Sequence, residues 1–394
     1  MPELIAVPIG FAGTAIRVPI DVLKQAEPAE AHNVRGIAYS EAGEHGLALD
    51  AFKQAIELKP DYVNAYYNLG LNAINCGCHD MALAALSKAI ELEPTFAEAY
   101  VNRGIAYEKN GEVDAVLERY HITVGLHSAP SGCGETAYQT AIAAAIEDYN
   151  TAIMLNPKLA AAYVNRGTAC CKRGEIDAAL AEYSTAITLK PDCTAGSVNR
   201  GILYDRKGER ARAIADYHRA IALAPDEPIA YNHRGMAYLH KGDAKRAIQD
   251  YNTAITLDSG YAEAYYYRGV AWLHLREWEK ASADLIAAKF KVLDIIAAFR
   301  DTYKSVVHFE RKTGVKLPED IAAMLMPKKD PGEREKATRR MLALKYYKTH
   351  ELSIGLAARL ACLPYNEFLT FMGKYRLSPF GETPGELAAE FANV

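Results

Sequence analysis

Hydrophobic and polar positions recur along most of the chain with a period of 34 residues. Each period holds an apolar stretch of helical spacing, a polar turn such as KNGE, KRGE or KGER, and a second amphipathic stretch. Prolines close five of the periods, at Pro60, Pro94, Pro157, Pro191 and Pro225. The pattern predicts a helix, a turn and a second helix in every period.

One glycine marks the period and shows how many copies there are. It recurs at Gly36, Gly70, Gly104, Gly167, Gly201, Gly235 and Gly269. The spacing is 34 residues everywhere except between Gly104 and Gly167, where it is 63. Removing residues 116–144, which include a Ser/Pro/Gly-rich stretch, restores the register. We therefore expect a lengthened hairpin or a protruding loop there, and seven units: 29–62, 63–96, 97–159, 160–193, 194–227, 228–261 and 262–295.

The small and aromatic positions of each unit indicate how its helices pack. An aromatic residue usually lies four positions before the glycine, and the second stretch combines alanines with an aromatic, as in Ala213, Tyr217 and Ala220. Small residues permit two helices to cross closely, and we expect the aromatic rings to fill the space beside them.

The period and the pattern resemble the tetratricopeptide repeat. The resemblance covers about two-thirds of the chain, from 29 to 295. It implies an all-α, right-handed superhelical solenoid of stacked helix pairs with a concave face. It also implies a function in protein–protein interaction, in which an extended or helical segment of a partner lies in the concave groove.

The hexapeptide AYVNRG, at 99–104 and 162–167, places an arginine directly before the glycine. Six units have this arginine, and the second has Leu69 instead. Units 3 to 7 have an acidic residue just before the second-helix aromatic, while units 1 and 2 have alanine. Buried arginine needs a carboxylate partner, so this co-occurrence predicts structural salt bridges. Pairing within a unit and pairing between neighbours both fit, and a ligand-binding role for the arginines is the alternative.

The asparagine beside the arginine is the main candidate for binding. In the family that the chain resembles, this position faces the groove, and the peptide-binding arrays of the nucleocytoplasmic glycosyltransferases carry a similar series of asparagines. An amide can donate to and accept from a peptide backbone. The candidate groove residues are Asn68, Asn102, Asn165, Asn199, Lys109, Lys172 and Arg206, with Tyr67 and Tyr266 as aromatic anchors.

Further inward positions predict a groove that is acidic to polar at its start and basic in its middle. The series that contains Lys109, Lys172 and Arg206 continues with His240 and His274. A partner with acidic residues or a free C-terminus would suit such a groove. The alternative is a solvated face whose asparagines bind water or neighbouring repeats.

The C-terminal region differs in pattern from the repeats. We expect one capping helix from Phe290 to Lys312 (residues 296–314 lie beyond the last repeat), a helix that begins near Pro318, a helix over 332–349, and a helix, turn and helix over 353–377. Residues 315–394 resemble Uncharacterised Protein Family 0175, whose members resemble antitoxins. The matching segments are Leu317–Ile321, Ala343–Tyr347, Leu352–Gly355 and Glu367–Leu369.

This C-terminal module supports an alternative function as a DNA-binding or toxin-binding regulator, with the repeats as sensor. Its turn has Cys362 where helix-turn-helix motifs prefer glycine, and PYNEF, which begins its second helix, lacks basic residues. The positive charge lies instead at Lys328, Lys329, Arg334, Lys336, Arg339 and Arg340, where phosphate or an acidic partner could bind.

Charge and cysteine content, together with short motifs, bear on whether the chain is secreted, membrane-bound or catalytic. Residues 289–394 hold 18 Lys and Arg against 13 Asp and Glu, whereas the rest holds 27 against 36. The N-terminal extension, residues 1–28, is a poor signal peptide and too short to span a membrane. Seven irregularly spaced cysteines fit a reducing cytoplasm. CGCH at 76–79 has too few ligands for a closed zinc site and SGCGE at 131–135 lacks a nucleophile elbow, so we expect no catalytic site, metal or cofactor.

Overall fold

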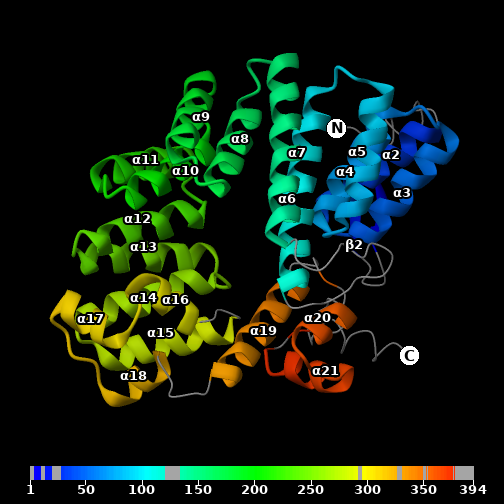
Figure 1. The fold of residues 1–394 in the computed structure, drawn as a ribbon. Coiled ribbons are helices and arrows are strands. Elements are labelled where there is room, and N and C mark those ends of the chain that lie inside the picture. Colours follow the sequence, from blue (N-terminus) through cyan, green and yellow to red (C-terminus); the bar gives the residue numbers. More distant parts are fainter. Residues whose placement is uncertain are drawn as a thin grey trace. The chain divides into compact units, whose positions relative to one another are not determined.

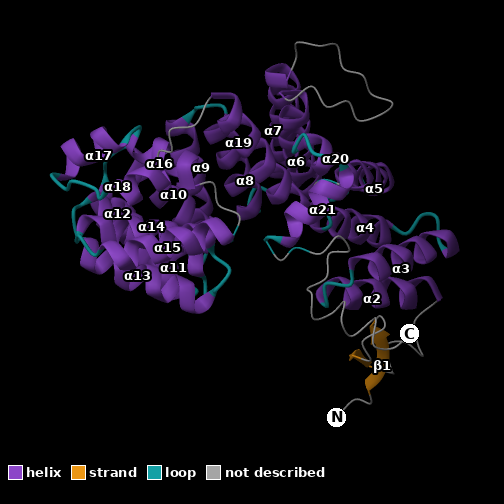
Figure 2. Ribbon diagram, turned by 90° about the horizontal axis from the view of Figure 1, so that it is seen from below, coloured by secondary structure: helices purple, strands orange, loops and turns teal. Residues whose placement is uncertain are grey.

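The structure is a computed structural model that describes residues 4–9, 14–19, 28–119, 134–291, 295–325, 331–348, 352, 354–375 and 377. All of its described elements except one small hairpin are helices (Figures 1 and 2). Strands β1 (Leu4–Ile9) and β2 (Thr14–Pro19) form the hairpin, with Val7 opposite Ile16. The helical repeat pattern does not predict this hairpin, although LIAVPI and TAIRVP are two runs rich in β-branched residues around a short Gly-containing connection.

The chain divides into two compact units, and the first includes residues 1–175. Its helices are α2 (Pro28–Glu41), α3 (His45–Leu58), α4 (Val63–Asn75), α5 (His79–Leu92), α6 (Ala97–Arg119), α7 (Gly134–Leu155) and α8 (Ala160–Lys172). Helix α2 packs on α3, α4 on α5 and α6 on α7. The predicted alternation of first and second helices is therefore confirmed.

The second compact unit begins at Ile176 and continues the same alternation. Its helices are α9 (Ile176–Leu189), α10 (Thr194–Arg206), α11 (Arg210–Leu223), α12 (Pro228–His240), α13 (Ala244–Leu257), α14 (Ala262–His274) and α15 (Trp278–Phe290). Helix α10 packs on α11, α12 on α13 and α14 on α15.

The glycine of the first helix and the aromatic residue of the second pack against each other, as the recurring spacing predicts. A Cβ atom on Gly104 would lie 2.5 Å from Tyr149 Cε1, and one on Gly201 would lie 2.7 Å from Tyr217 Cε1. The rings therefore occupy the space that a side chain at these glycines would need. The aromatic of the first helix has a second role, because the hydroxyl of Tyr100 donates to the carbonyl of Pro94, six residues earlier.

The third repeat departs from the prediction, because KNGE is not a turn there. Helix α6 continues through Gly111 to Arg119, and α7 begins at Gly134. A Cβ atom on Gly111 would lie 2.5 Å from the Cβ of Ala141, so the lengthened helices stay in contact at this point. The insertion thus lengthens both helices of one hairpin. SGCGE lies largely outside the described residues.

The expected single capping helix is wrong. This segment instead forms two helices, α16 (Ile295–Tyr303) and α17 (Val306–Thr313). The helix breaks at Lys304, which adopts a left-handed φ of 59°. Ser305 then caps α17, because its hydroxyl accepts from the amide of His308 at 3.1 Å. Gly314 ends α17 in the left-handed conformation. Serine before a helical stretch was the available signal.

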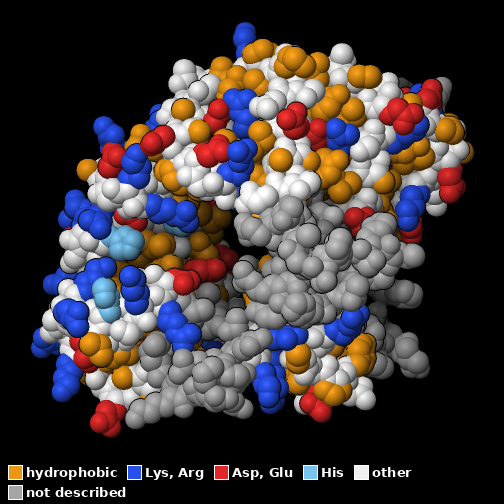
Figure 3. Space-filling model, viewed as in Figure 1, with side chains coloured by type: hydrophobic (Ala, Val, Ile, Leu, Met, Phe, Trp, Pro, Cys, Tyr) orange, Lys and Arg blue, Asp and Glu red, His pale blue; other side chains and the backbone are white. Residues whose placement is uncertain are grey.

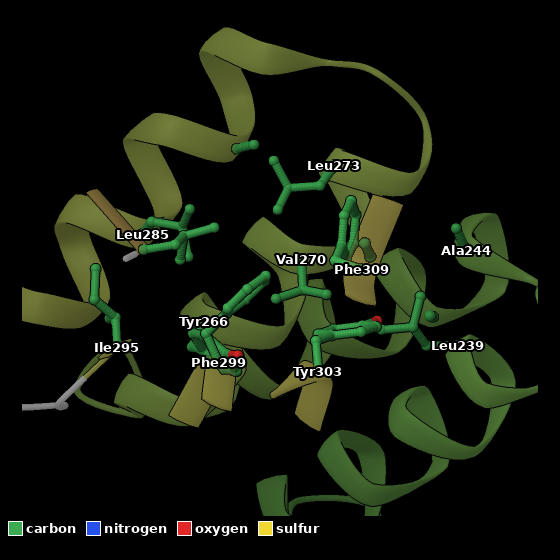
Figure 4. Packing of buried hydrophobic residues seen from close by; sticks show 14 of the residues in the cluster. Leu239, Ala244, Tyr266, Val270, Leu273, Leu285, Ile295, Phe299, Tyr303 and Phe309 are labelled. Carbon is green, nitrogen blue, oxygen red and sulfur yellow. The ribbon is translucent and has the colours of Figure 1, made fainter. Parts of the chain in front are cut away.

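Helices α16 and α17 close the core of the last repeats. Figure 4 shows Phe299, Tyr303 and Phe309 packed against Tyr266 and Val270 of α14. The same core continues through four later residues, Val315, Leu317, Ile321 and Leu325. The predicted boundary at 314/315 therefore lies inside a continuous core, and the first segment of the C-terminal module packs with the repeats.

The C-terminal module is a group of short helices. They are α18 (Glu319–Leu325), α19 (Pro331–Lys348), α20 (Ile354–Leu360) and α21 (Tyr365–Gly373). Ala357, Leu360 and Phe368 are fully buried. Cys362, in the turn between α20 and α21, has a left-handed φ of 52°, a conformation that favours glycine.

We expect Cys362→Gly to stabilise the α20–α21 pair by about 0.5–1 kcal/mol, because glycine adopts this backbone conformation without strain. Cys362 is exposed, so the substitution removes little packing. Hydrogen exchange of the α20 and α21 amides measures the change, with Cys362→Ser as the control that keeps a Cβ. Faster exchange in the glycine variant would contradict the expectation.

Candidate functional site

In four repeats the arginine before the glycine forms a bidentate salt bridge with the acidic residue of the same repeat. Arg200 donates from Nε and Nη2 to the two carboxylate oxygens of Asp216, at 2.9 and 2.7 Å. The same geometry joins Arg103 to Asp148, Arg234 to Asp250 and Arg268 to Asp284. These carboxylates are buried. Pairing within the repeat is therefore confirmed.

The third nitrogen of the guanidinium binds the preceding repeat. Nη1 of Arg200 donates to the hydroxyl of Ser184, and Nη1 of Arg268 donates to the side chain of Asn252 at 2.7 Å. Arg103 and Arg166 make equivalent contacts with Ser87 and Asn150. The salt bridge thus lies within the repeat, while the third nitrogen ties that repeat to the previous one through a neutral side chain.

The two repeats that lack the acidic residue have other contacts at the arginine position. Arg35 bonds to His32, at 2.9 Å, in place of a carboxylate. In the second repeat, Leu69 and Ala85 are buried together in one apolar cluster. A bidentate pair in four repeats and an apolar pair in another indicate that the position is structural.

The candidate asparagines fall into two groups. Asn68 donates to the side chain of Asn33 at 3.0 Å, and Asn102 donates to the hydroxyl of Tyr67 at 3.1 Å. These two therefore link neighbouring repeats. Asn165 and Asn199 are half-buried and make no side-chain hydrogen bond with any residue that the structure describes. Their amides remain available to a ligand.

Most of the predicted basic series is paired with acidic side chains, which belong to the preceding repeat for Lys172 and His240 and to the same helix for Lys109. Lys172 lies 2.5 Å from Glu108 and 2.8 Å from Glu112, and Lys109 lies 3.5 Å from Glu112. His240 Nδ1 lies 2.8 Å from Asp205. Arg206 is exposed and, within the described chain, forms no ion pair. The expected basic middle of the groove is therefore reduced chiefly to Arg206.

The two candidate aromatic anchors also differ. Tyr67 is half-buried, its ring lies 4.7 Å from that of Phe96, and its hydroxyl accepts from Asn102. Tyr266 is 0% exposed, because Phe299 and Tyr303 of α16 cover it (Figure 4). The prediction that Tyr266 anchors a partner is therefore wrong for this structure, since the capping helices occupy that surface.

Comparison with protein families decides the identity of the repeats. A tetratricopeptide repeat model matches residues 137–192 and 198–262, and a TPR repeat model matches 36–71 and 76–111. The model of uncharacterised protein family UPF0175 matches 311–394. The chain combines tetratricopeptide repeats with a C-terminal UPF0175 domain. No curated protein matches it.

Solved tetratricopeptide repeat proteins are similar in fold. A protein from Parabacteroides merdae is 20% identical, with 68% of this chain and 94% of that one covered and a TM-score of 0.49. TTC0263 from Thermus thermophilus is 21% identical, with 54% and 99% covered and a TM-score of 0.44. YrrB, titled a TPR protein with an unusual peptide-binding site, is 20% identical, with 55% and 96% covered and a TM-score of 0.34.

Histidine replaces the asparagine in the sixth tetratricopeptide repeat, and burial decides its protonation. The ring of His233 stacks on Tyr217, with centroids 6.0 Å apart. Burial lowers the pKa of His233 to about 4, although the nearby Asp205 carboxylate acts in the opposite direction. The folded protein therefore holds this histidine neutral at pH values where the unfolded chain protonates it.

We expect the tetratricopeptide repeats to lose about 1–2 kcal/mol of stability through His233 as the pH falls from 6.5 towards 4, because only the unfolded chain gains the proton in this range. His233→Asn, which restores the residue of four other repeats, should remove that share of the pH dependence. Urea unfolding of both proteins at the two pH values measures it. An NMR titration of His233 with a pKa near its usual value would contradict the expectation.

Three other possibilities are a metal site, a membrane-spanning helix and a reactive cysteine. Among them, no group of three or more His, Cys, Asp or Glu side chains could hold a metal ion, and no helix is long and apolar enough to cross a membrane. Burial raises the pKa of the Cys76 thiol, in CGCH, to about 11. Cys170 lies in the core as predicted.

The basic residues of the UPF0175 domain are partly engaged inside it. Arg339 donates from Nε to the carbonyl of Leu360 at 2.9 Å, and the guanidinium of Arg340 lies 5.9 Å from the ring centre of Phe371. These two of the six basic residues are therefore engaged within the domain. Lys336 is exposed, and Lys328 and Lys329 lie outside the described residues, as does the side chain of Arg334.

Proposed function

We propose that this protein binds a partner protein through the face of the first helices that carries the asparagine position. Tetratricopeptide repeat proteins mediate protein–protein interactions. The observation that carries the proposal is the state of Asn165 and Asn199. Asn165 lies in the first compact unit and Asn199 in the second, each is half-buried, and no described side chain or backbone group bonds either amide.

An extended segment of the partner suits this arrangement. Each amide supplies one donor and one acceptor for a peptide backbone, which gives affinity without requiring a particular side chain. Arg206 lies seven residues after Asn199 on α10, two helical turns along the same face. Because its guanidinium has no carboxylate partner among the described residues, a carboxylate of the partner would find its counter-charge there.

The first repeats contribute less to this proposed site. Asn68 and Asn102 already bond to Asn33 and Tyr67, so a ligand would have to displace those contacts. Lys172 is likewise shared by two carboxylates. We place the interaction in the cytoplasm, the compartment that the irregular cysteine spacing favours.

The test is capture of partners from native extract by the full chain and by two variants. Asn165→Ala with Asn199→Ala should lose at least about tenfold of the captured partner, since two amides with two hydrogen bonds each contribute roughly that free energy. The matched control is Gln54→Ala with Gln249→Ala, two exposed amides on the second helices α3 and α13. Equal recovery from both variants would disprove the proposed role of the asparagines.

A further inference from the structure

The turns between the first and second helices of repeats 5 to 7 carry a surplus of exposed positive charge. These turns lie between α10 and α11, α12 and α13, and α14 and α15. We call them, together with the neighbouring segment 304–316, the turn edge. Its exposed cations are Arg206, Lys207, Arg212, Lys241, Lys245, Arg246, Arg276, Lys280, Lys304, Arg311, Lys312 and Lys316.

Most acidic residues of the turn edge are engaged by neighbouring side chains, and Glu279 is an exposed exception. Glu209 pairs with Arg212 at 2.6 Å, and Glu277 pairs with Lys280 at 3.2 Å. Asp243 pairs with Arg246 and also accepts from its amide at the start of α13. Among the described residues, Arg206, Lys241, Lys245, Arg276, Lys304, Arg311, Lys312 and Lys316 form no ion pair. The remaining charge of the edge is therefore almost entirely positive.

Side-chain contacts join the successive turns into one surface. Asp205 of the fifth repeat meets His240 of the sixth at 2.8 Å. A shallow pocket of about 420 Å³ joins Lys241 and Lys245 of the sixth turn to Leu275 of the seventh. His274 bonds to the hydroxyl of Tyr303, and Lys312 lies over that ring at 5.4 Å. The cations thus belong to a continuous edge, and Figure 3 shows Lys and Arg gathered on the left side, over these elements.

The chemistry of the turn edge suits phosphate better than a protein surface. Protein interfaces are anchored by aromatic side chains in desolvated pockets. Here the aromatic rings of Tyr204, Tyr238 and Trp272 are covered by cations, which lie 5.5, 4.8 and 4.7 Å from the ring centres. Exposed lysines and arginines without aromatic anchors are typical of sequence-independent contact with a nucleic-acid backbone.

The corresponding turns of the first repeats provide an internal comparison. The first turn reads EAGEH at 41–45 and the second CGCHD at 76–80, with neither lysine nor arginine. Neighbouring repeats in a solenoid present equivalent positions at regular intervals, so a local change of charge makes a local surface. The formal charge of the whole chain is −4, so the net charge alone does not indicate this positively charged edge.

We propose that the turn edge of repeats 5 to 7 is a second binding surface, which contacts the phosphate backbone of nucleic acid without reading its sequence. It shares only Arg206 with the asparagine face and does not depend on the proposed function. Lysine and arginine side chains that bind phosphates displace the cations condensed on the nucleic acid. Because the release of these cations is less favourable at high salt, the affinity falls steeply as the salt concentration rises. The surface would hold a nucleic acid while the asparagine face holds a protein.

The test uses the full chain with labelled single-stranded and duplex DNA of about 30 nucleotides, at ionic strengths between roughly 50 and 200 mM, where phosphate contacts change affinity most. The edge variant is Lys241→Glu, Lys245→Glu and Arg276→Glu. The control variant is Lys53→Glu, Lys158→Glu and Lys190→Glu, three exposed lysines away from the edge that form no ion pair with a described residue. Both variants change the net charge equally, and thermal unfolding shows that both fold.

The edge variant should bind at least about tenfold more weakly at low salt, with a log–log salt slope smaller by about 2–3, because each lost phosphate contact removes about one unit. The control variant should bind within about twofold of the parent. Failure of the parent to bind either DNA, or equal losses in both variants, would overturn the proposal. So would equally tight binding of poly-glutamate, or binding that persists in the edge variant and disappears in Lys336→Glu.

Discussion

Asp216→Ala should destabilise the protein by about 3 kcal/mol, because it leaves the guanidinium of Arg200 half-buried without its carboxylate. Hydrogen bonding to Asp216 raises the pKa of Arg200, against the opposing effect of burial, so the charge cannot be relieved by deprotonation. The variant that also carries Arg200→Leu should be less destabilised than Asp216→Ala alone. The second repeat shows the reason, since Leu69 and Ala85 fill the equivalent space.

Chemical unfolding of the parent, both single variants and the double variant measures this coupling. Arg35→Leu is the matched control, because Arg35 bonds to His32 and has alanine where Arg200 has Asp216. It should change stability by less than about 0.5 kcal/mol. Simple additivity of Arg200→Leu and Asp216→Ala would contradict the pairing.

Gly235→Ala should cost about 2–3 kcal/mol, because the added Cβ would lie 2.7 Å from Cε1 of Tyr251. That ring is fully buried and stacks on Tyr267, with centroids 6.2 Å apart, so it has little room to move. Either α12 or α13 must shift, and the shift disturbs the adjacent Arg234–Asp250 pair.

Gly46→Ala is the control for the steric argument. Gly46 also lies in a helix, α3, but nothing lies within 4 Å of a Cβ built there. Alanine is the better helix former, so this variant should gain a few tenths of a kcal/mol. Loss of stability in both variants to a similar degree would show that backbone propensity, and not the crossing with Tyr251, controls the result.

The sequence was sufficient to predict the helix pairs and to predict that the arginines pair with acidic residues, but it left open whether each pair lies within one repeat or between neighbours. A period of 34 residues with glycine, aromatic and proline at set places describes contacts between neighbouring helices, which are local in the chain. Arginine and the acidic residue occur together in the later repeats, whereas the second repeat has Leu69 and Ala85 at the two positions. This co-occurrence indicates direct contact, and Arg200 and Asp216 lie 2.7 Å apart in the structure.

Other features depended on contacts that no local pattern records. The length of α6 arises where Gly111 meets Ala141, across an insertion that the period itself cannot describe. The burial of Tyr266 follows from the break at Lys304, which folds α16 and α17 over the last repeat.

By itself, the sequence determined the repeat, its helix pairs and the structural role of the arginines, because those interactions recur at fixed spacing between neighbouring elements. Only the tertiary structure decided which inward side chains remain available. Asn68, Asn102 and Lys172 are engaged by the preceding repeat, whereas Asn165, Asn199 and Arg206 are not. It also gathered the cations of the turn edge from three turns. The physical reason is that availability and surface charge depend on how neighbouring repeats stack, and stacking brings together residues that are distant in the chain.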